Sequence, residues 1–141
     1  MALQITRAAL DLILAQARRD HPLETCGIVA AAAGSALAAR VVPMRNRAAS
    51  ERFFHFDPAE QFRVFRELDA RDEACRVIYH SHTASEAYPS RDDIDYAGDP
   101  EAHYLIVSTW PQARVAVRSY RIAGGRAMEE SIATEDPPAA T

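Results

Sequence analysis

The segment Cys75–His82 constrains the fold more than any other part of this sequence. Its alternating pattern and β-branched residues predict a strand, and that strand ends in His80-Ser81-His82. Side chains two apart on a strand leave the same face, so the two imidazoles should converge while Ser81 points to the opposite side. The chain is therefore expected to fold around a strand that ends in two facing histidines.

A second polar pair follows that strand after the loop Thr83–Pro89. Ser90 and Asp93 stand three apart at the start of a short predicted helix, where they share a face. Taken alone, this spacing is typical of a helix N-cap. Capping and metal binding are compatible, and the loop is long enough to bring Asp93 back over the strand end. We therefore predict a metal site made by His80, His82 and Asp93.

The donor set indicates which metal and which chemistry to expect. Three nitrogen and oxygen ligands without a thiolate match a catalytic zinc ion, one per chain, which keeps its fourth position for water. Glu24 is the candidate base, because a carboxylate beside the metal can take a proton from water and deliver it to a leaving amine. Ser90 is the candidate donor to the developing oxyanion. The pattern predicts a zinc-dependent hydrolase that cuts an amide bond.

Other residues of the same types have simpler expected roles. Because a Glu before a strand is most often solvated, the role of Glu24 depends on what the fold places beside it. His21, His55 and His103 lack partners in a cluster, so we expect surface or hydrogen-bonded core positions for them. Cys26 is either a small buried residue or a thiol close to the metal, and the two cysteines of the chain are expected to be reduced.

The rest of the chain predicts helices and strands in mixed order. Expected helices cover residues 7–19, 58–71 and 90–97, and expected strands cover 25–33, 36–44, 52–56, 75–82, 102–109, 114–122 and 126–132. Thr6 and Asp57 are the expected caps of the first two helices, and Phe62, Phe65 and Leu68 should face inward. We expect one α+β domain over residues 1–134, with mixed helix and sheet layers, and a disordered tail over 135–141.

Composition limits the partners. A chain of 141 residues with 48% hydrophobic residues suits one domain. Its formal charge of −4 and its lack of long basic runs argue against nucleic acid, and its apolar stretches are too short to span a membrane. We expect a cytoplasmic protein, and the sequence leaves open whether it is a monomer or a homodimer.

The motif as a whole resembles a known family. Glu24, His80-Ser81-His82, Ser90 and Asp93 resemble the signature of the JAMM (MPN-domain) metalloproteases, and segments 18–22, 24–27 and 79–90 are similar to their short bacterial Mec+-like branch. The resemblance implies zinc held by the two histidines and Asp93, Glu24 as the base and Ser90 near the oxyanion. It also implies a curved mixed sheet flanked by helices, the cytidine-deaminase-like JAMM/MPN fold.

The resemblance further implies a substrate. It is a ubiquitin-like sulfur carrier protein whose C-terminal diglycine is joined to cysteine, which the enzyme releases. Two alternatives remain: trimming of extra C-terminal residues from a carrier, and a non-catalytic MPN-type scaffold. We expect the compact chain to lack the insertions that hold ubiquitin in deubiquitinating relatives, which argues against cleavage of polyubiquitin. Deamination is disfavoured because the His-x-Glu and Pro-Cys-x-x-Cys pattern of zinc deaminases is absent.

Overall fold

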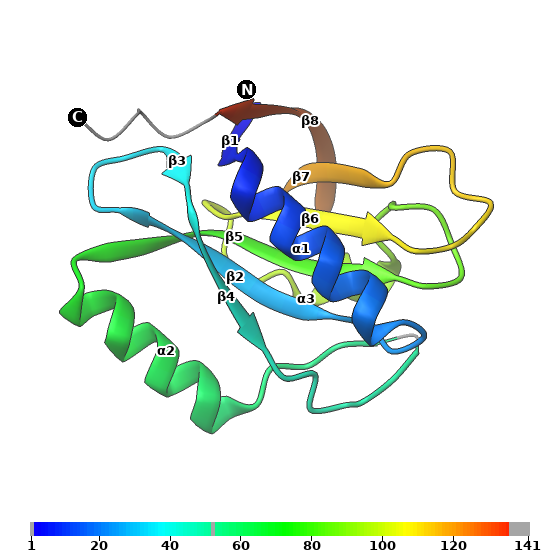
Figure 1. Ribbon diagram of the computed structural model, residues 1–141, viewed down its shortest axis with the longest axis horizontal. Helices are drawn as coiled ribbons and strands as arrows, with labels where there is room; N and C mark the ends of the chain where they lie inside the picture. Colours follow the sequence, from blue (N-terminus) through cyan, green and yellow to red (C-terminus); the bar gives the residue numbers. More distant parts are fainter. Residues whose placement is uncertain (1, 52, 136–141) are drawn as a thin grey trace.

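The structure, a computed structural model, describes residues 2–51 and 53–135, which form one mixed sheet with helices on both faces (Figure 1). The helices are α1 (Arg7–Asp20), α2 (Pro58–Ala70) and α3 (Arg91–Tyr96). The strands are β1 (Ala2–Thr6), β2 (Cys26–Ala32), β3 (Leu37–Ala38), β4 (Arg40–Met44), β5 (Glu73–His82), β6 (His103–Ser108), β7 (Val117–Ala123) and β8 (Arg126–Glu135). The predicted α+β class, with a curved mixed sheet flanked by helices, is confirmed.

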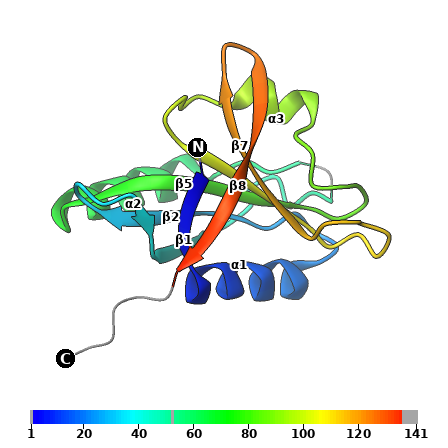
Figure 2. The ribbon, with the colours of Figure 1, turned by 90° about the horizontal axis from the view of Figure 1, so that it is seen from above.

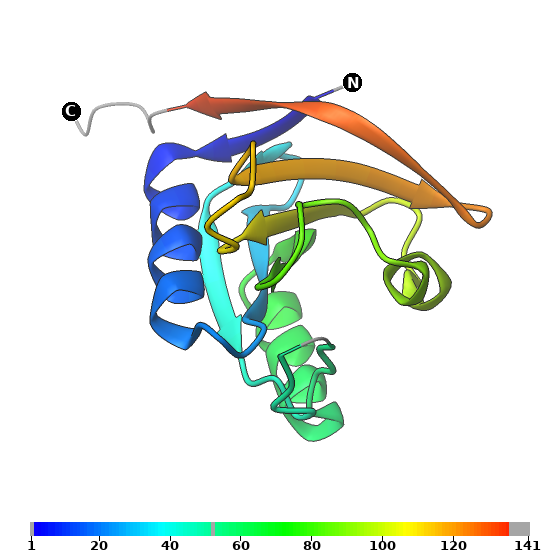
Figure 3. The same cartoon turned by 90° about the vertical axis from the view of Figure 1, so that its right-hand side faces the viewer.

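The sheet places the histidine-bearing strand in its interior. The strand order is β3-β1-β8-β7-β6-β5-β2-β4, so β5 lies between β2 and β6. β5 runs parallel to β6 and antiparallel to β2, while β1 runs parallel to both of its neighbours. Figure 3 shows how strongly the sheet curves from β4 to β8. Both neighbouring strands, β2 and β6, can therefore place residues beside the two histidines at the end of β5.

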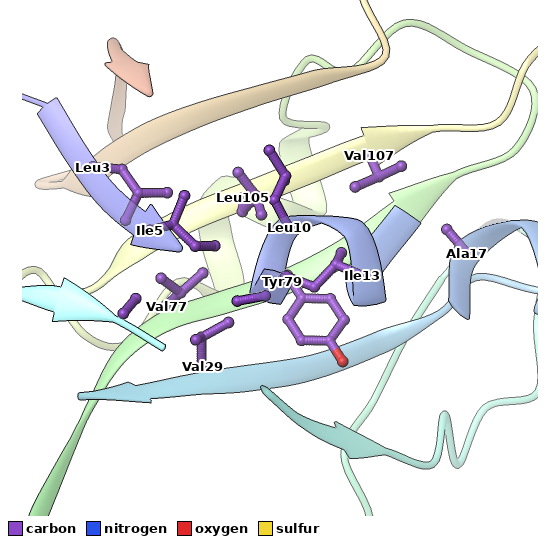
Figure 4. Close-up of a cluster of buried hydrophobic side chains, with 12 residues drawn as sticks. Leu3, Ile5, Leu10, Ile13, Ala17, Val29, Val77, Tyr79, Leu105 and Val107 are labelled. Carbon is purple, nitrogen blue, oxygen red and sulfur yellow. The ribbon is translucent and has the colours of Figure 1, made fainter. Parts of the chain in front are cut away.

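The helices divide between the two faces of the sheet (Figure 2). α1 packs on one face, where its buried side chains meet an apolar cluster from five strands (Figure 4). It begins where the sequence predicted, because the Thr6 hydroxyl accepts from the Ala9 N–H at 3.1 Å. α2 and α3 flank the opposite face, which contains two smaller apolar clusters. The site described below lies on that second face.

The second helix starts as predicted but packs less deeply. Asp57 caps it by accepting from the Ala59 N–H, and Pro58 occupies its first turn. Leu68 is buried and Phe65 packs partly against the sheet, but Phe62 is 65% exposed, so its predicted inward position is wrong. The reason is that α2 rests mainly on β5 and β4 and buries a narrow stripe, in which Leu68 is the one fully buried residue.

Two predicted strands differ from the structure. The expected strand 36–44 is divided: β4 pairs with β2, but β3 pairs with β1, a strand that the sequence did not predict. The expected aromatic strand 52–56 is wrong, because residues 53–56 make only an isolated bridge between Phe56 and Asn46. Arg52 lies outside the described residues. The His55 N–H donates to the Asn46 side chain and not to the backbone of a neighbouring strand.

The end of the chain agrees in part with the prediction. β8 extends three residues beyond the expected 132 and ends at Glu135, which pairs with Thr6. The rest of the predicted disordered tail, 136–141, lies outside the described residues, and the single domain over 1–134 stays a prediction. Cys26 and Cys75 are both free, as expected. None of the helices in residues 2–51 and 53–135 is long and apolar enough to cross a membrane.

Candidate metal centre and catalytic site

His80 and His82 lie side by side at the end of β5, on the face flanked by α2 and α3. Their side chains are buried, with 3% and 7% of the residue surface exposed. Their Nε2 atoms are 3.2 Å apart, which is possible because residues two apart on a strand share a face. Ser81, between them, is fully buried in the opposite direction. The two imidazoles thus point at one place in a nearly closed site.

Asp93 completes the cluster from the first turn of α3. Its Oδ2 lies 3.1 Å from His80 Nε2 and 3.0 Å from His82 Nε2. The Ser90 N–H donates to the same oxygen at 2.8 Å, while the Ser90 hydroxyl accepts from the Asp93 N–H. This reciprocal pair is a capping box, so the cap that starts α3 also fixes the direction of the Asp93 carboxylate.

The three donor atoms fit a tetrahedral metal ion. Zinc lies about 2.0–2.1 Å from its nitrogen and oxygen ligands, which places ligand atoms about 3.3–3.4 Å apart in a tetrahedron. The three separations between His80 Nε2, His82 Nε2 and Asp93 Oδ2 are 3.0–3.2 Å. The cluster is therefore nearly as wide as a zinc triangle, and its nitrogen and oxygen donors are the types that zinc takes.

The tautomer of His82 favours a cation at this point. Its Nδ1 donates to the Glu86 carbonyl at 3.0 Å, so in the neutral ring Nε2 carries a lone pair. That lone pair faces an Asp93 carboxylate oxygen, and the two repel unless a proton or a metal ion lies between them. Such a second hydrogen bond on a metal-binding histidine is a common way to orient the ring.

The pKa values of the cluster reflect this convergence. Burial disfavours the Asp93 carboxylate, but hydrogen bonds to His80 and His82 outweigh it and hold the pKa of Asp93 well below its usual range. Burial lowers the pKa of His80. Burial acts the same way on His82, but hydrogen bonds to Asp93 and the Glu86 carbonyl raise its pKa overall. The site thus holds an ionised carboxylate facing two imidazoles.

Glu24 lies beside this cluster, immediately before β2. β2 pairs with β5 in a register that places Cys26 opposite His80, and Glu24 precedes Cys26 by two residues. Glu24 is 5% exposed, and burial raises its pKa to about 7, with the charge of His82 lowering the value and that of Asp93 raising it. A buried carboxyl group that senses both residues is suited to moving protons at this site.

Ser81 anchors the segment that carries Glu24. Its hydroxyl accepts from the Thr25 N–H at 2.8 Å, and its N–H donates to the Thr25 carbonyl at 3.1 Å. Thr25 in turn donates to Asp20, the last residue of α1. Sequence reasoning placed Ser81 on the opposite face but gave it no function. Only the pairing of β2 with β5 makes its role visible.

A cleft of about 490 Å³ leads away from the cluster between α2 and α3. Its floor comes from β5, β6 and β7, including Ile78 and Ile106. One wall is residues 53–56, and the other is α3 and the residues after it, including Tyr96. Since His80 and Asp93 are among the residues that line it, a chain lying in this largely apolar cleft would reach the cluster of His80, His82 and Asp93.

The remaining candidates have structural partners. Cys26 is fully buried, its thiol donates to the Met44 carbonyl at 3.5 Å, and burial raises its pKa to about 12, so it behaves as a small core residue. His21 Nδ1 bonds Thr109, His103 Nδ1 bonds Glu130, and His55 is exposed. None of the three belongs to the cluster formed by His80, His82 and Asp93, as expected, although His55 lines the same cleft.

Comparison with known proteins identifies the family to which this chain is similar. Residues 6–123 match a family described as prokaryotic homologs of the JAB domain. The chain is 47% identical over 129 residues to the CysO-cysteine peptidase of Mycobacterium tuberculosis, covering 91% of this chain and 88% of the relative. It is 30% identical over 138 residues to the desampylase of Haloferax volcanii, covering 94% of this chain and 96% of the relative.

Solved structures agree with the fold. The solution structure of protein DSY2949 from Desulfitobacterium hafniense is similar, with a TM-score of 0.81, 30% identity, and 95% of this chain and 93% of that chain covered. AF2198, a JAB1/MPN domain protein from Archaeoglobus fulgidus, matches with a TM-score of 0.61, 18% identity, and 94% and 99% coverage. At this identity the second likeness concerns the fold alone.

Proposed function

The chain belongs to the family of prokaryotic homologs of the JAB domain, and from that membership we propose a specific reaction for it. In this proposal it is a zinc-dependent peptidase that hydrolyses the amide bond after the C-terminal diglycine of a ubiquitin-like sulfur carrier protein and releases cysteine. The observation that carries the proposal is the convergence of His80, His82 and Asp93 within 3.2 Å of one another, beside the buried carboxyl group of Glu24.

His80, His82 and Asp93 are the proposed ligands of the zinc ion. When bound, zinc would supply a Lewis acid that polarises the scissile carbonyl and lowers the pKa of water. The Glu86 carbonyl keeps His82 in the tautomer whose Nε2 is free to bind a metal. The Ser90 N–H holds the Asp93 carboxylate in place.

Glu24 is the proposed general base and acid. Its carboxylate takes a proton from the attacking water and then delivers that proton to the amine of the leaving cysteine. A pKa near 7 in a buried position suits a group that must both accept and return a proton. The backbone of the adjacent Thr25 is fixed by Ser81, which limits how far Glu24 can move.

Ser90 is the proposed donor to the oxyanion. Its hydroxyl oxygen accepts from the Asp93 N–H at 3.1 Å, which leaves the hydroxyl hydrogen available for donation. The same residue thus caps α3, orients Asp93 and offers a hydrogen bond to negative charge that develops on the carbonyl oxygen.

The proposed substrate combines the names of relatives with the shape of the site. A protein 47% identical to this chain is called a CysO-cysteine peptidase, which supports a protein–cysteine conjugate as substrate. A diglycine tail has no side chains, so it would fit the part of the cleft that His80 and Asp93 line, beside the proposed metal ligands. The apolar part of the cleft would then receive residues that precede the diglycine.

The test is a mass measurement on a defined conjugate. A sulfur carrier ending in diglycine and extended by one C-terminal cysteine is incubated with zinc-loaded wild type or with Glu24→Gln. We expect the wild type to remove the mass of one cysteine and Glu24→Gln to be slower by about 10²–10⁴-fold. A wild type that binds zinc but leaves this conjugate intact would reject the substrate.

A second candidate is trimming of extra residues from the tail of a carrier. It is favoured by the relative called a desampylase, whose name describes a different activity from cysteine release. Carriers extended by one, two or four residues after the diglycine separate the two reactions, because a cysteine-releasing enzyme should prefer the single-residue extension. A non-catalytic scaffold predicts no cleavage of any conjugate and no effect of Glu24→Gln.

A further inference from the structure

Asn46 uses every hydrogen-bonding position of its side-chain amide. Its Nδ2 donates to the carbonyl of Glu24 at 3.1 Å and to that of Phe53 at 2.8 Å. Its Oδ1 accepts from the N–H of Ala48 at 3.0 Å and from that of His55 at 3.1 Å. An amide offers two donors and two acceptor positions, so this side chain is saturated. All four bonds go to the backbone of segments around the site.

One side of this network holds the aromatic wall of the cleft, by which we mean Phe53–Phe56. Two of its four residues are bound directly by Asn46. The Phe54 ring stacks on His80 with centroids 4.4 Å apart, and the Phe53 ring meets Tyr96 of α3 edge-on at 5.9 Å. The aromatic wall therefore contacts a proposed metal ligand and the opposite side of the cleft.

The other side of the network holds Glu24. Its N–H donates to the Ser50 carbonyl at 2.9 Å, and its own carbonyl accepts from Asn46. Both backbone polar groups of Glu24 are thus bonded to the segment 46–50. The segment that fixes the backbone of Glu24 is the same one that folds around the Asn46 amide.

We propose that Asn46 is a positioning residue that couples the aromatic wall to Glu24. Through it, a substrate seated against the wall and the carboxylate that handles the proton are held in one geometry. The proposal rests on the proposed function, in which Glu24 is the base. Misplacement of a reacting group by about 1 Å can cost on the order of 10²-fold in rate, so a small shift of Glu24 would be measurable.

Two substitutions separate the donor and acceptor halves of the amide. Asn46→Asp keeps an oxygen for the Ala48 and His55 N–H groups but loses both donors and sets a carboxylate oxygen against two carbonyls. Asn46→Ala loses all four bonds. We expect kcat to fall about 10–100-fold in both variants with zinc content unchanged. KM should rise clearly only in Asn46→Ala, because only there is the aromatic wall released on the His55 side.

Thr83→Val is the matched control. The Thr83 hydroxyl donates to the Glu51 carbonyl at 3.0 Å, so it tethers the same stretch of chain without a bond to Glu24. Valine keeps the shape and removes that one hydrogen bond. Its kcat should stay close to that of the wild type, and a loss equal to that of Asn46→Asp would show that any loosening of this segment lowers kcat.

Amide hydrogen exchange provides a readout that needs no substrate. In the wild type, the amides of Glu24 and His55 should open together, with the same opening free energy. The Glu24 amide should exchange faster in both Asn46 variants and unchanged in Thr83→Val, while the His55 amide should lose protection only in Asn46→Ala. Zinc content and urea unfolding establish that each variant is folded.

The outcomes separate this inference from the proposed function. If the wild type fails to cleave the carrier conjugate, the proposed function fails, and the exchange pattern still decides whether Asn46 couples the two segments. If the wild type is active but Asn46→Asp keeps both its kcat and the protection of the Glu24 amide, the coupling is overturned and the peptidase assignment stands.

Discussion

The two faces of the sheet differ although they share the same strands. On the α1 face, β5 contributes Val77 and Tyr79 to a closed apolar cluster. On the opposite face the same strand contributes Ile78, His80 and His82 to a cleft and a polar cluster. Alternation along a strand thus lets one face hold the strand rigidly while the other presents reactive groups. We call the α1 face the closed face and the face that carries the cleft the open face. The closed face holds β5 in the fixed position that a metal site needs.

The closed face is held together by particular contacts as well as by apolar packing. The Tyr79 ring lies directly over Gly27, where a Cβ atom would collide with it. The Tyr79 hydroxyl donates to Gln16 of α1, and Gln16 donates to the Cys26 carbonyl at 3.2 Å. These contacts join α1, β2 and β5 behind the two histidines. Within residues 2–51 and 53–135, no hydrogen bond or ion pair joins α2 to α3 on the open face.

The largest expected effect comes from two adjacent residues of β6 that face opposite ways. Leu105 and Ile106 are both fully buried, but Leu105 belongs to the closed cluster and Ile106 lines the cleft. Leu105→Ala should lower the free energy of unfolding by about 2–5 kcal/mol and leave KM unchanged. Ile106→Ala should lie at the low end of that range and raise KM. Urea unfolding and steady-state kinetics check both variants. Equal effects on KM would show that the two faces do not differ in their contact with substrate.

Ser81→Ala tests whether the closed face positions Glu24, the proposed base. The substitution leaves the buried Thr25 N–H without its side-chain acceptor, which costs about 1–3 kcal/mol. Because Thr25 adjoins Glu24, kcat should also fall while KM and zinc content hold. Loss of stability with an unchanged kcat would show that the anchor supports the fold alone.

Tyr79→Phe should have a smaller and purely structural effect. It removes the hydroxyl that donates to Gln16, at a cost of about 1 kcal/mol. The ring still covers Gly27, so kcat should match the wild type. A clear drop in kcat measured beside urea unfolding would mean that the hydrogen bond behind β5 reaches the reactive face.

Glu73→Gln concerns the end of β5 remote from the histidines and should have the smallest effect. Arg40 donates to Glu73 at 2.7–3.0 Å, and these hydrogen bonds lower the pKa of Glu73 below its usual 4.5. A lowered pKa stabilises the fold above the unfolded value, and this stabilisation is lost as pH falls through the folded value.

The substitution should therefore cost less than about 1 kcal/mol at pH 7 and weaken the loss of stability below pH 4.5. Unfolding curves at several pH values measure both. A larger loss of stability would show that this ion pair contributes more than a part-exposed pair usually does, and a change in kcat would show that the two ends of β5 are coupled.

Local patterns in the sequence predicted much of the fold and the site. Spacing of two along a strand and of three at a helix cap placed His80, His82, Ser90 and Asp93 together, because both rules act within a few residues. Placing Glu24 beside them needed the pairing of β2 with β5, which no local pattern specifies. The roles of these residues stay predictions.

What the sequence missed is non-local. β1 is short, and its partners β3 and β8 lie further along the chain. Nothing in its local sequence therefore distinguishes it from an irregular segment before α1. The aromatic residues 53–56 have strand-like composition, but their partners are the Asn46 side chain and His80. Asn46 itself stands in a polar run and reads as an ordinary turn residue.

If His80, His82 and Asp93 hold zinc, as we propose, the zinc content of the protein should depend on these ligands and not on Glu24. Wild type, Glu24→Gln and Asp93→Ala are loaded with zinc, dialysed, checked for folding and measured by mass spectrometry of the metal. We expect about one zinc per chain in the first two proteins and a large loss in Asp93→Ala. A folded wild type that retains no zinc, or an Asp93→Ala variant that retains as much as the wild type, would contradict it.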